Sequence, residues 1–254
     1  MLYETFNANK ESFGEDFFTS RLDDEVVRNL NLKFELREYQ KEALGRFDFY
    51  FGGYQKRAYP AQLLFHMATG SGKTLIMAAN ILQLYKQGYR NFIFFVNSTN
   101  IIEKTKDNFL NPLSEKYLFA QKIKFGDKEV FIKEVDNFEA ASPEDINILF
   151  ITIQGLHTRL NFPKENALTY EDFLDKEIVL ISDEAHHLQT ITKKSREEIE
   201  LERSWEFTVE KILKSNIKNI LLEFTATIGL GNQNIRQKYE DKIIFQYDLK
   251  QFRL

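Results

Sequence analysis

The sequence predicts an α/β fold in three layers, in which a mostly parallel β-sheet has helices on both faces. Apolar runs of strand length recur along the chain, and most are nearly continuous, as is typical of strands buried on both faces. Helix-like stretches separate several of them, and this alternation favours a parallel sheet. The strand-like runs begin at Gln62, Asn91, Glu129, Ile146, Glu177 and Asn219. The helix-like stretches begin at Leu36, after Lys73 and at Thr99.

The composition bounds the possible functions. The chain has 254 residues, enough to bury a core without disulfides, and it contains no cysteine. Disulfides, thiolate zinc sites and cysteine nucleophiles are therefore excluded, and a cytoplasmic location is expected. The apolar runs are short, so we expect no membrane-spanning helix and no secretory signal. A net charge of −4 does not exclude nucleic-acid binding, since a local stripe can bind phosphates.

The two ends of the chain differ from its middle. Residues 1–34 are polar with scattered phenylalanines, and they are interpreted as an N-terminal appendage to a domain that covers residues 35–254. Residues 190–203 are charged and predict a solvated loop or an exposed helix. The tail beyond Thr227 predicts one more strand.

The strongest local signal is MATGSGKT, residues 67–74, which follows an apolar strand and opens an amphipathic helix. This context predicts a phosphate-binding loop, although a methionine replaces the first glycine of G-x-x-x-x-G-K-[ST]. Gly70 and Gly72 let the backbone curl, so that amide N–H groups converge on a phosphate at the helix N-terminus. Lys73 would reach the β- and γ-phosphates, and Thr74 would offer its hydroxyl to Mg²⁺. The residues expected around the nucleotide phosphates are Thr69, Gly70, Ser71, Gly72, Lys73 and Thr74.

A second signal is the apolar strand that ends in two carboxylates within IVLISDEAHH, residues 178–187. The carboxyl ends of parallel strands face the ligand crevice, so Asp183 is expected near the phosphate loop, holding Mg²⁺ partly through water. Glu184 would orient or deprotonate the attacking water. Such a pair alone would be an ordinary loop start. Together with Lys73 it predicts ATP hydrolysis.

Two further segments are candidates for coupling. His186 and His187 are adjacent and point apart, which disfavours metal ligation. A hydrogen bond from His186 to a later loop is favoured instead. The later loop is FTAT after the run at Asn219, where Thr225 and Thr227 could bridge to the acidic segment.

In this order, GSGKT, DEAH and TAT resemble the motifs of superfamily-two helicases, the DEAD/DEAH-box class. The resemblance implies a RecA-like P-loop NTPase domain, the first of two motor domains. LREYQKEAL, residues 36–44, is similar to the Q-motif of that class, which implies that Gln40 reads the adenine edge with Arg37 or Tyr39 packed nearby. The segments VNSTN and ITIQG are similar to motifs that contact the nucleic-acid backbone. The residues that would make those contacts are Ser98, Thr99, Thr152 and Gln154.

A narrower resemblance covers roughly Leu36 to Ile228. MATGSGKT, SDEAHH, SWEFTVEKIL and LLEFTATI together resemble the Res subunit of type III restriction–modification enzymes. This implies a motor that uses ATP and Mg²⁺ to translocate on double-stranded DNA, endonucleolytic cleavage by another domain, and a methyltransferase subunit as partner. Type I motor subunits and other phage-defence helicases share many of these motifs.

Nothing after Thr227 resembles the second motor domain, and no nuclease signature is convincing. We therefore expect the first RecA-like domain alone, with the second RecA-like domain and the nuclease domain absent, and little ATP hydrolysis by this chain. A single lobe that binds nucleotide as an interaction module in a defence complex is the alternative. Lys73→Ala in the full-length protein distinguishes the two, because a motor would lose translocation. A P-loop kinase is disfavoured by DEAH and TAT.

Overall fold

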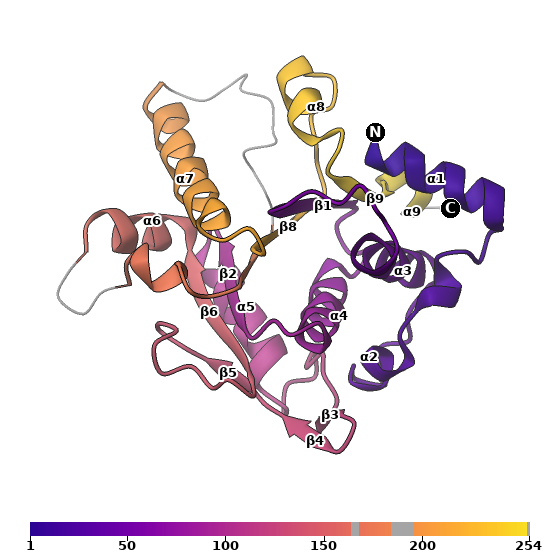
Figure 1. Cartoon of the computed structure of the whole chain (residues 1–254), viewed down its shortest axis with the longest axis horizontal. Coiled ribbons are helices and arrows are strands. Elements are labelled where there is room, and N and C mark those ends of the chain that lie inside the picture. Colours follow the sequence, from indigo (N-terminus) through magenta and orange to yellow (C-terminus); the bar gives the residue numbers. More distant parts are fainter. Residues whose placement is uncertain (164–167, 184–195, 253–254) are drawn as a thin grey trace.

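The computed structural model describes residues 1–163, 168–183 and 196–252. Within these residues the central element is a seven-stranded sheet in which all neighbouring strands are parallel (Figure 1). In sheet order the strands are β5 (Ile132–Glu134), β6 (Ile146–Thr152), β2 (Asn91–Val96), β7 (Ile178–Asp183), β8 (Ile220–Thr225), β1 (Ala61–Met67) and β9 (Ile243–Tyr247). The predicted parallel α/β sheet is confirmed.

Helices cover both faces of the sheet, as Figure 1 shows. One face carries α1 (Leu2–Phe13), α2 (Asp24–Arg28), α3 (Glu38–Gly52), α4 (Lys73–Lys86) and α5 (Thr99–Leu110). The other face carries α6 (Ile153–Asn161), α7 (Arg196–Ser215) and α8 (Gln233–Tyr239). Shorter elements are the 3-10 turns η1 (Thr19–Arg21) and η2 (Glu171–Phe173) and the terminal α9 (Leu249–Phe252). The predicted three layers are confirmed.

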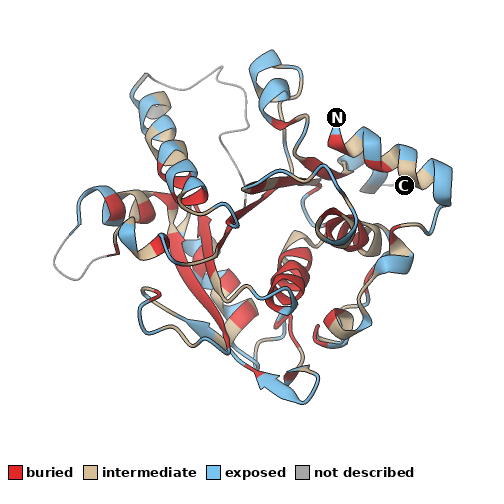
Figure 2. Cartoon of the chain, viewed as in Figure 1, coloured by how far each residue is buried: buried red, intermediate tan, exposed pale blue. Residues whose placement is uncertain are grey.

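The apolar strand runs are explained by burial on both faces. In β2, Phe92 and Phe94 pack in the core on the α4 side, whereas Ile93 and Phe95 pack in the core on the α6 and α7 side. Successive strand side chains point to opposite faces, so a strand covered on both sides needs apolar residues at every position. Figure 2 shows this burial along the central strands and through α4, whose residues 75–85 are all buried.

Residues 1–34, expected as an appendage, contribute side chains to the main core. Leu2, Phe6 and Phe18 are at most 5% exposed and belong to the same apolar cluster as the sheet. Arg46 on α3 reinforces this contact, since its guanidinium donates to the side chains of Asn7 and Glu42. The predicted domain boundary at residue 35 stays a prediction.

The run predicted as one strand from Glu129 is two strands in different sheets. β4 (Lys128–Val130) pairs in an antiparallel hairpin with β3 (Ile123–Phe125), whereas β5 joins the edge of the main sheet. Between them the amide of Phe131 donates to the carboxylate of Asp145 at 3.0 Å. This side-chain bond takes the Phe131 N–H, while the Phe131 carbonyl accepts from the N–H of Ile146 in β6, so the main-chain pairing changes partner at this residue.

The charged segment and the tail follow the predictions where they are described. Residues 184–195 lie outside the described residues, and α7 begins at Arg196. The strand predicted beyond Thr227 is β9. Among the residues that the structure describes, no helix is long and apolar enough to cross a membrane.

Candidate functional site

The carboxyl edge of the sheet gathers most of the predicted site residues. Because the seven strands of the main sheet run in parallel, their carboxyl ends lie at one edge. The strand register places Thr152 beside Val96, Asp183 beside Phe224 and Thr225 beside His66. The phosphate loop follows β1 at the same edge. The described site residues that follow these strands therefore share one surface. They lie along it in the order of the strands that they follow.

The phosphate loop has the backbone that its glycines predict. Gly70 and Gly72 have φ of 82° and 84°, in the left-handed region that other residues rarely adopt. The Ser71 hydroxyl donates to the carbonyl of Ala68 at 2.7 Å, which closes the loop on itself. α4 begins directly after the loop, at Lys73. Its first amides and its positive dipole end lie where a phosphate would bind.

Lys73 and Thr74 lie at the start of α4. The ammonium of Lys73 donates to the carbonyls of Met67 and Ala68 at 3.3 and 3.4 Å. It thus lies across the mouth of the loop, within reach of a group bound there. Thr74 is half-buried in the first turn of the helix.

The beginning of α3 packs directly on the phosphate loop. The Gln40 side chain is 5% exposed, and its amide nitrogen donates to the carbonyl of Ser71 at 2.9 Å. Its amide oxygen accepts from the backbone N–H of Arg37, which caps the helix. The hydroxyl of Tyr39 also donates to the Ser71 carbonyl, at 2.9 Å. Burial raises the pKa of Tyr39 and outweighs the lowering by Arg37, so this donor keeps its proton.

A residue that the motifs did not identify completes this contact. The ring of Tyr247 in β9 stacks on Tyr39, with centroids 4.0 Å apart and planes 10° apart. The carbonyl of Tyr247 also accepts from the N–H of Ala68 in the phosphate loop at 2.9 Å. β9 and α3 therefore hold the loop from two sides. Tyr247 lies in a tail with no recognised motif, so no sequence signal indicated its role.

The acidic strand end is described only as far as Asp183. Asp183 is the last residue of β7, and one of its carboxylate oxygens is buried. β8 lies between β7 and β1, so Asp183 is two strand spacings, about 10 Å, from the strand that leads into the phosphate loop. Glu184 and His186 lie outside the described residues.

The TAT segment forms a compact turn at the end of β8. The Thr225 hydroxyl donates to the carbonyl of Thr227 at 2.7 Å, and the Thr227 N–H donates back to it at 3.2 Å. Thr225 is buried and Thr227 is exposed. The turn therefore exposes Thr227 at the shared edge, and the hydrogen bonds of the buried Thr225 hydroxyl hold the turn.

The predicted nucleic-acid residues lie at two neighbouring helix N-termini. Ser98 precedes α5 and Thr99 begins it, directly after β2. Thr152 precedes α6, and its hydroxyl accepts from the N–H of Gly155 at 3.0 Å; Gln154 lies in the first turn. Since β2 and β6 are adjacent, two positive helix ends follow neighbouring strands at the shared edge, α5 on one face of the sheet and α6 on the other.

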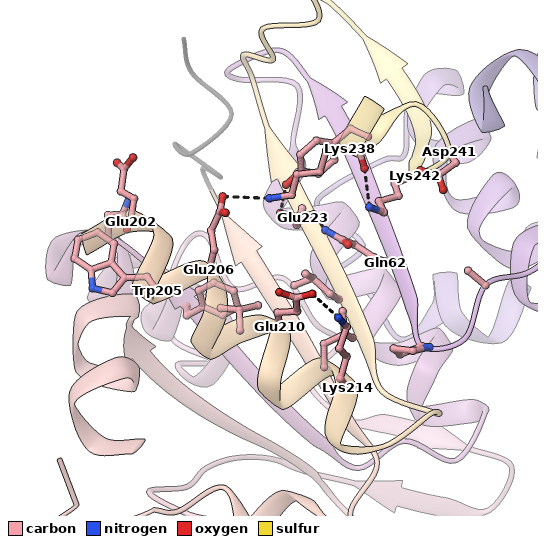
Figure 3. A pocket seen from close by; sticks show the side chains of 18 of the residues that line it. Gln62, Glu202, Trp205, Glu206, Glu210, Lys214, Glu223, Lys238, Asp241 and Lys242 are labelled. Carbon is pink, nitrogen blue, oxygen red and sulfur yellow. Dashed lines mark hydrogen bonds and ion pairs between the residues drawn. The ribbon is translucent and has the colours of Figure 1, made fainter. Parts of the chain in front are cut away.

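A cavity of about 470 Å³ lies between α7, α8 and the sheet (Figure 3). Its floor includes Glu223, whose carboxylate accepts from Gln62 at 2.6 Å and Tyr239 at 3.0 Å. The ion pair between Glu206 and Lys238 crosses from α7 to α8. No phosphate-loop residue lines the cavity, so it is separate from the nucleotide site predicted here.

A parallel sheet, a glycine loop between β1 and α4, and an acidic strand end two strands away define a P-loop ATPase domain of the helicase type. The family described as "Type III restriction enzyme, res subunit" matches residues 33–230. The chain belongs to this family. The resemblance drawn from the motifs is confirmed.

Similar proteins agree with this assignment. The chain is 41% identical over 264 aligned residues to the probable type III restriction-modification enzyme HindVIP Res subunit of Haemophilus influenzae. The match covers 93% of this chain and 50% of that protein, so the chain spans about half the length of its curated relative.

Solved structures share the fold. The UvsW helicase from bacteriophage T4 has a TM-score of 0.51 and 17% identity, over 97% of this chain and 77% of that one. The DUF1998 helicase MrfA, solved bound to DNA and AMPPNP, has a TM-score of 0.50 and 16% identity, over 90% and 29%. These identities support the fold alone.

Proposed function

We propose that this chain is the ATP-binding lobe of a DNA-dependent motor, acting as in the restriction subunit of a type III restriction–modification system. The observation that carries the proposal is the phosphate loop, with Lys73 across its mouth and Asp183 at the same sheet edge. In a Res subunit such a lobe would couple ATP hydrolysis to DNA translocation before another domain cleaves the DNA.

The phosphates of ATP would bind to the amides of the loop and to the Lys73 ammonium. Gln40 supports adenine recognition, because its bonds to Ser71 and Arg37 leave one N–H and one oxygen lone pair. A glutamine side chain can then accept from N6 and donate to N7 of adenine. MrfA, which shares the fold, was solved with the ATP analogue AMPPNP.

The donors available for Mg²⁺ fit that ion. Thr74 offers a hydroxyl and Asp183 a carboxylate, and Mg²⁺ prefers oxygen ligands while keeping several waters. The spacing of about 10 Å between the two strands leaves room for such waters. When bound, the ion would neutralise charge on the β- and γ-phosphates.

Hydrolysis would require groups beyond the phosphate loop. Glu184 follows Asp183 directly and would orient the attacking water. A second RecA-like domain would supply arginines that stabilise the transition state, which in other phosphoryl-transfer systems contribute about 10³–10⁵ in rate. We therefore expect this chain to bind ATP weakly and to hydrolyse it very slowly. A methyltransferase subunit is the proposed partner that reads the DNA target.

The DNA backbone would lie across the N-termini of α5 and α6. The hydroxyls of Ser98, Thr99 and Thr152 and the side-chain amide of Gln154 can donate to phosphates, at the positive ends of the two helices. These contacts carry no base information, so binding should be independent of sequence and sensitive to salt. MrfA was solved bound to DNA.

Titrating this chain with double-stranded DNA at several salt concentrations tests the interface. We expect affinity to fall with salt, with a logarithmic slope of about −0.9 per phosphate contacted. Thr99→Asp should weaken binding at least about fivefold by repelling phosphate, although an acidic residue there suits the helix dipole. The control Thr158→Asp, exposed and beyond the first turn of α6, should bind as the parent does. Affinity that does not change with salt would contradict this interface.

A further inference from the structure

Three aromatic rings connect the buried part of the sheet with the first turn of α3. Phe245 of β9 is 3% exposed and belongs to the main core. Tyr247 lies two residues further along the same face of the strand, and its ring stacks with that of Phe245 at 6.5 Å and 15°. The ring of Tyr39 in turn stacks on Tyr247 at 4.0 Å and 10°. Tyr39 is therefore held by a ring that is itself anchored in the core.

The main chain of Tyr247 has a separate task, which is to support the phosphate loop. Tyr247 is the register partner of Met67 in β1, and its carbonyl accepts from the N–H of Ala68 at 2.9 Å. Its hydroxyl points away from this bond, since it donates to the carbonyl of Gln251 at 3.1 Å. The backbone thus contacts the loop, whereas the ring contacts α3. A substitution of the side chain can remove the second contact and leave the first in place.

The turn of α3 that the ring contacts carries the residue proposed to read adenine. The Tyr39 hydroxyl and the Gln40 amide nitrogen donate to the same Ser71 carbonyl, each at 2.9 Å. These two bonds use both lone pairs of that carbonyl. The Gln40 oxygen accepts from the N–H of Arg37 at 2.9 Å, so the orientation of its amide is fixed relative to the turn. The place of Gln40 beside the loop therefore depends on the place of this turn, which the stack of Tyr39 on Tyr247 holds against β9.

We propose that Tyr247 is a positioning residue for the nucleotide base, which holds Gln40 where it favours adenine over guanine. The proposal deepens the proposed function and rests on it, since it requires a nucleotide on the phosphate loop. Adenine presents an amino group at N6, whereas guanine presents the carbonyl O6 at the equivalent position. A glutamine held with its oxygen toward that position accepts from adenine and repels guanine. Tyr247 acts through Tyr39 and takes no part in the chemistry.

The experiment measures the affinities for Mg·ATP, Mg·GTP and magnesium tripolyphosphate by displacement of a fluorescent ATP analogue. Tripolyphosphate carries no base, so it reports on the phosphate loop alone. We expect the parent to bind ATP more tightly than GTP. Tyr247→Leu should weaken ATP binding about fivefold, the size of an aromatic pair. The same variant should leave GTP and tripolyphosphate binding unchanged, because the backbone bond to Ala68 remains.

Three further variants separate the ring from the rest of the side chain. Tyr247→Phe keeps the ring and loses only the hydroxyl bond to Gln251, so it should bind all three ligands as the parent does. Tyr247→Met repeats the test of Tyr247→Leu with a second side chain that has no ring. Tyr54→Leu is the matched control, because it removes a tyrosine that stacks on Tyr50 at the opposite end of α3, and it should keep the preference for ATP.

Several outcomes would overturn the proposal. Equal weakening of ATP and tripolyphosphate in Tyr247→Leu would mean that the ring supports only the loop. Unchanged ATP binding in Tyr247→Leu, or a parent that binds ATP and GTP equally well, would contradict a role in reading the base. A parent that binds none of the three ligands would instead overturn the proposed function itself, which distinguishes the two failures.

Discussion

Gly72 allows Gln40 to pack against the phosphate loop. A Cβ atom at this position would lie 2.4 Å from the Gln40 amide nitrogen, and φ is +84°. Both features exclude a side chain. The glycine that the motif predicts for phosphate binding therefore also makes room for the helix that would read the adenine.

Gly72→Ala should reduce nucleotide affinity at least about tenfold. The left-handed backbone costs a non-glycine residue about 1–2 kcal/mol, and 1.4 kcal/mol is a factor of ten. Displacement of Gln40 adds to this cost. The measurement is equilibrium titration with a fluorescent ATP analogue. Gly52→Ala, where a Cβ would meet nothing within 4 Å, is the control and should bind normally. Equal affinities for the two variants would contradict this role of Gly72.

The motif residues could be predicted because each motif is a short local segment with its own chemistry. The phosphate loop needs its glycines and Lys73 in sequence, and Asp183 must end a strand. Tyr247 could not be predicted in the same way, because its contact with Tyr39 joins a strand and a helix that meet only in the folded chain.

At the scale of elements, α1 is attached to the core by a buried cation. Arg46 is 2% exposed and donates to Glu42 at 2.9 Å, to Asn7 at 2.6 Å and to the carbonyl of Ile244 at 3.3 Å. One side chain thus joins α1, α3 and β9. The N-terminal sequence is mostly polar, and its few phenylalanines are the residues that pack in the core. The sequence therefore did not indicate this contact.

Arg46→Met should lower the free energy of unfolding by about 3 kcal/mol, since it leaves buried acceptors without their cation. Chemical denaturation measures the change. Lys41→Met on the same helix is the control, because it removes only an exposed ion pair with Glu38 and should change stability by about 0.5 kcal/mol or less. Equal losses in both variants would mean that Arg46 does not attach α1 to the core.

The junction between β4 and β5 depends on Asp145. Burial raises its pKa, but hydrogen bonds from Lys133, Ser142 and the Phe131 amide outweigh burial, so the pKa lies below the usual value. A lowered pKa contributes stability above the unfolded pKa, near 3.9, and that contribution disappears as the pH falls through the folded value. Sequence patterning predicted one strand here because it does not detect a side chain that replaces a ladder bond.

Asp145→Asn should destabilise the protein by about 1–2 kcal/mol at pH 7, since its amide nitrogen cannot accept from Ser142 or Lys133. The difference from the parent should shrink below about pH 4, where the carboxylate is protonated first in the unfolded parent and, at lower pH, in the folded one. Urea unfolding across pH 3–7 measures both effects. Asp127→Asn, exposed in the hairpin turn, is the control. A difference that stays constant down to pH 3 would contradict this origin of stability.

At the scale of the whole molecule, the parallel sheet positions the site. The apolar runs could predict parallel strands buried on both faces, because such strands need apolar side chains at consecutive positions. They could not predict the strand order, which depends on where each crossover packs. The order β6-β2-β7-β8-β1 places the helix ends proposed for DNA at one end of the edge and the phosphate loop near the other. Three strand spacings, about 14 Å, separate the α5 end from the phosphate loop, and four, about 19 Å, separate the α6 end from it.

The central claim is that Lys73 and its loop hold ATP. Calorimetric titration of Mg·ATP into this chain tests it most directly, with Lys104→Ala on the exposed side of α5 as the control. We predict weak binding at a single site, unchanged by Lys104→Ala and weakened at least about tenfold by Lys73→Ala, which removes a charge-assisted contact to phosphate. Absence of binding by the parent, or equal affinity of Lys73→Ala, would contradict the account.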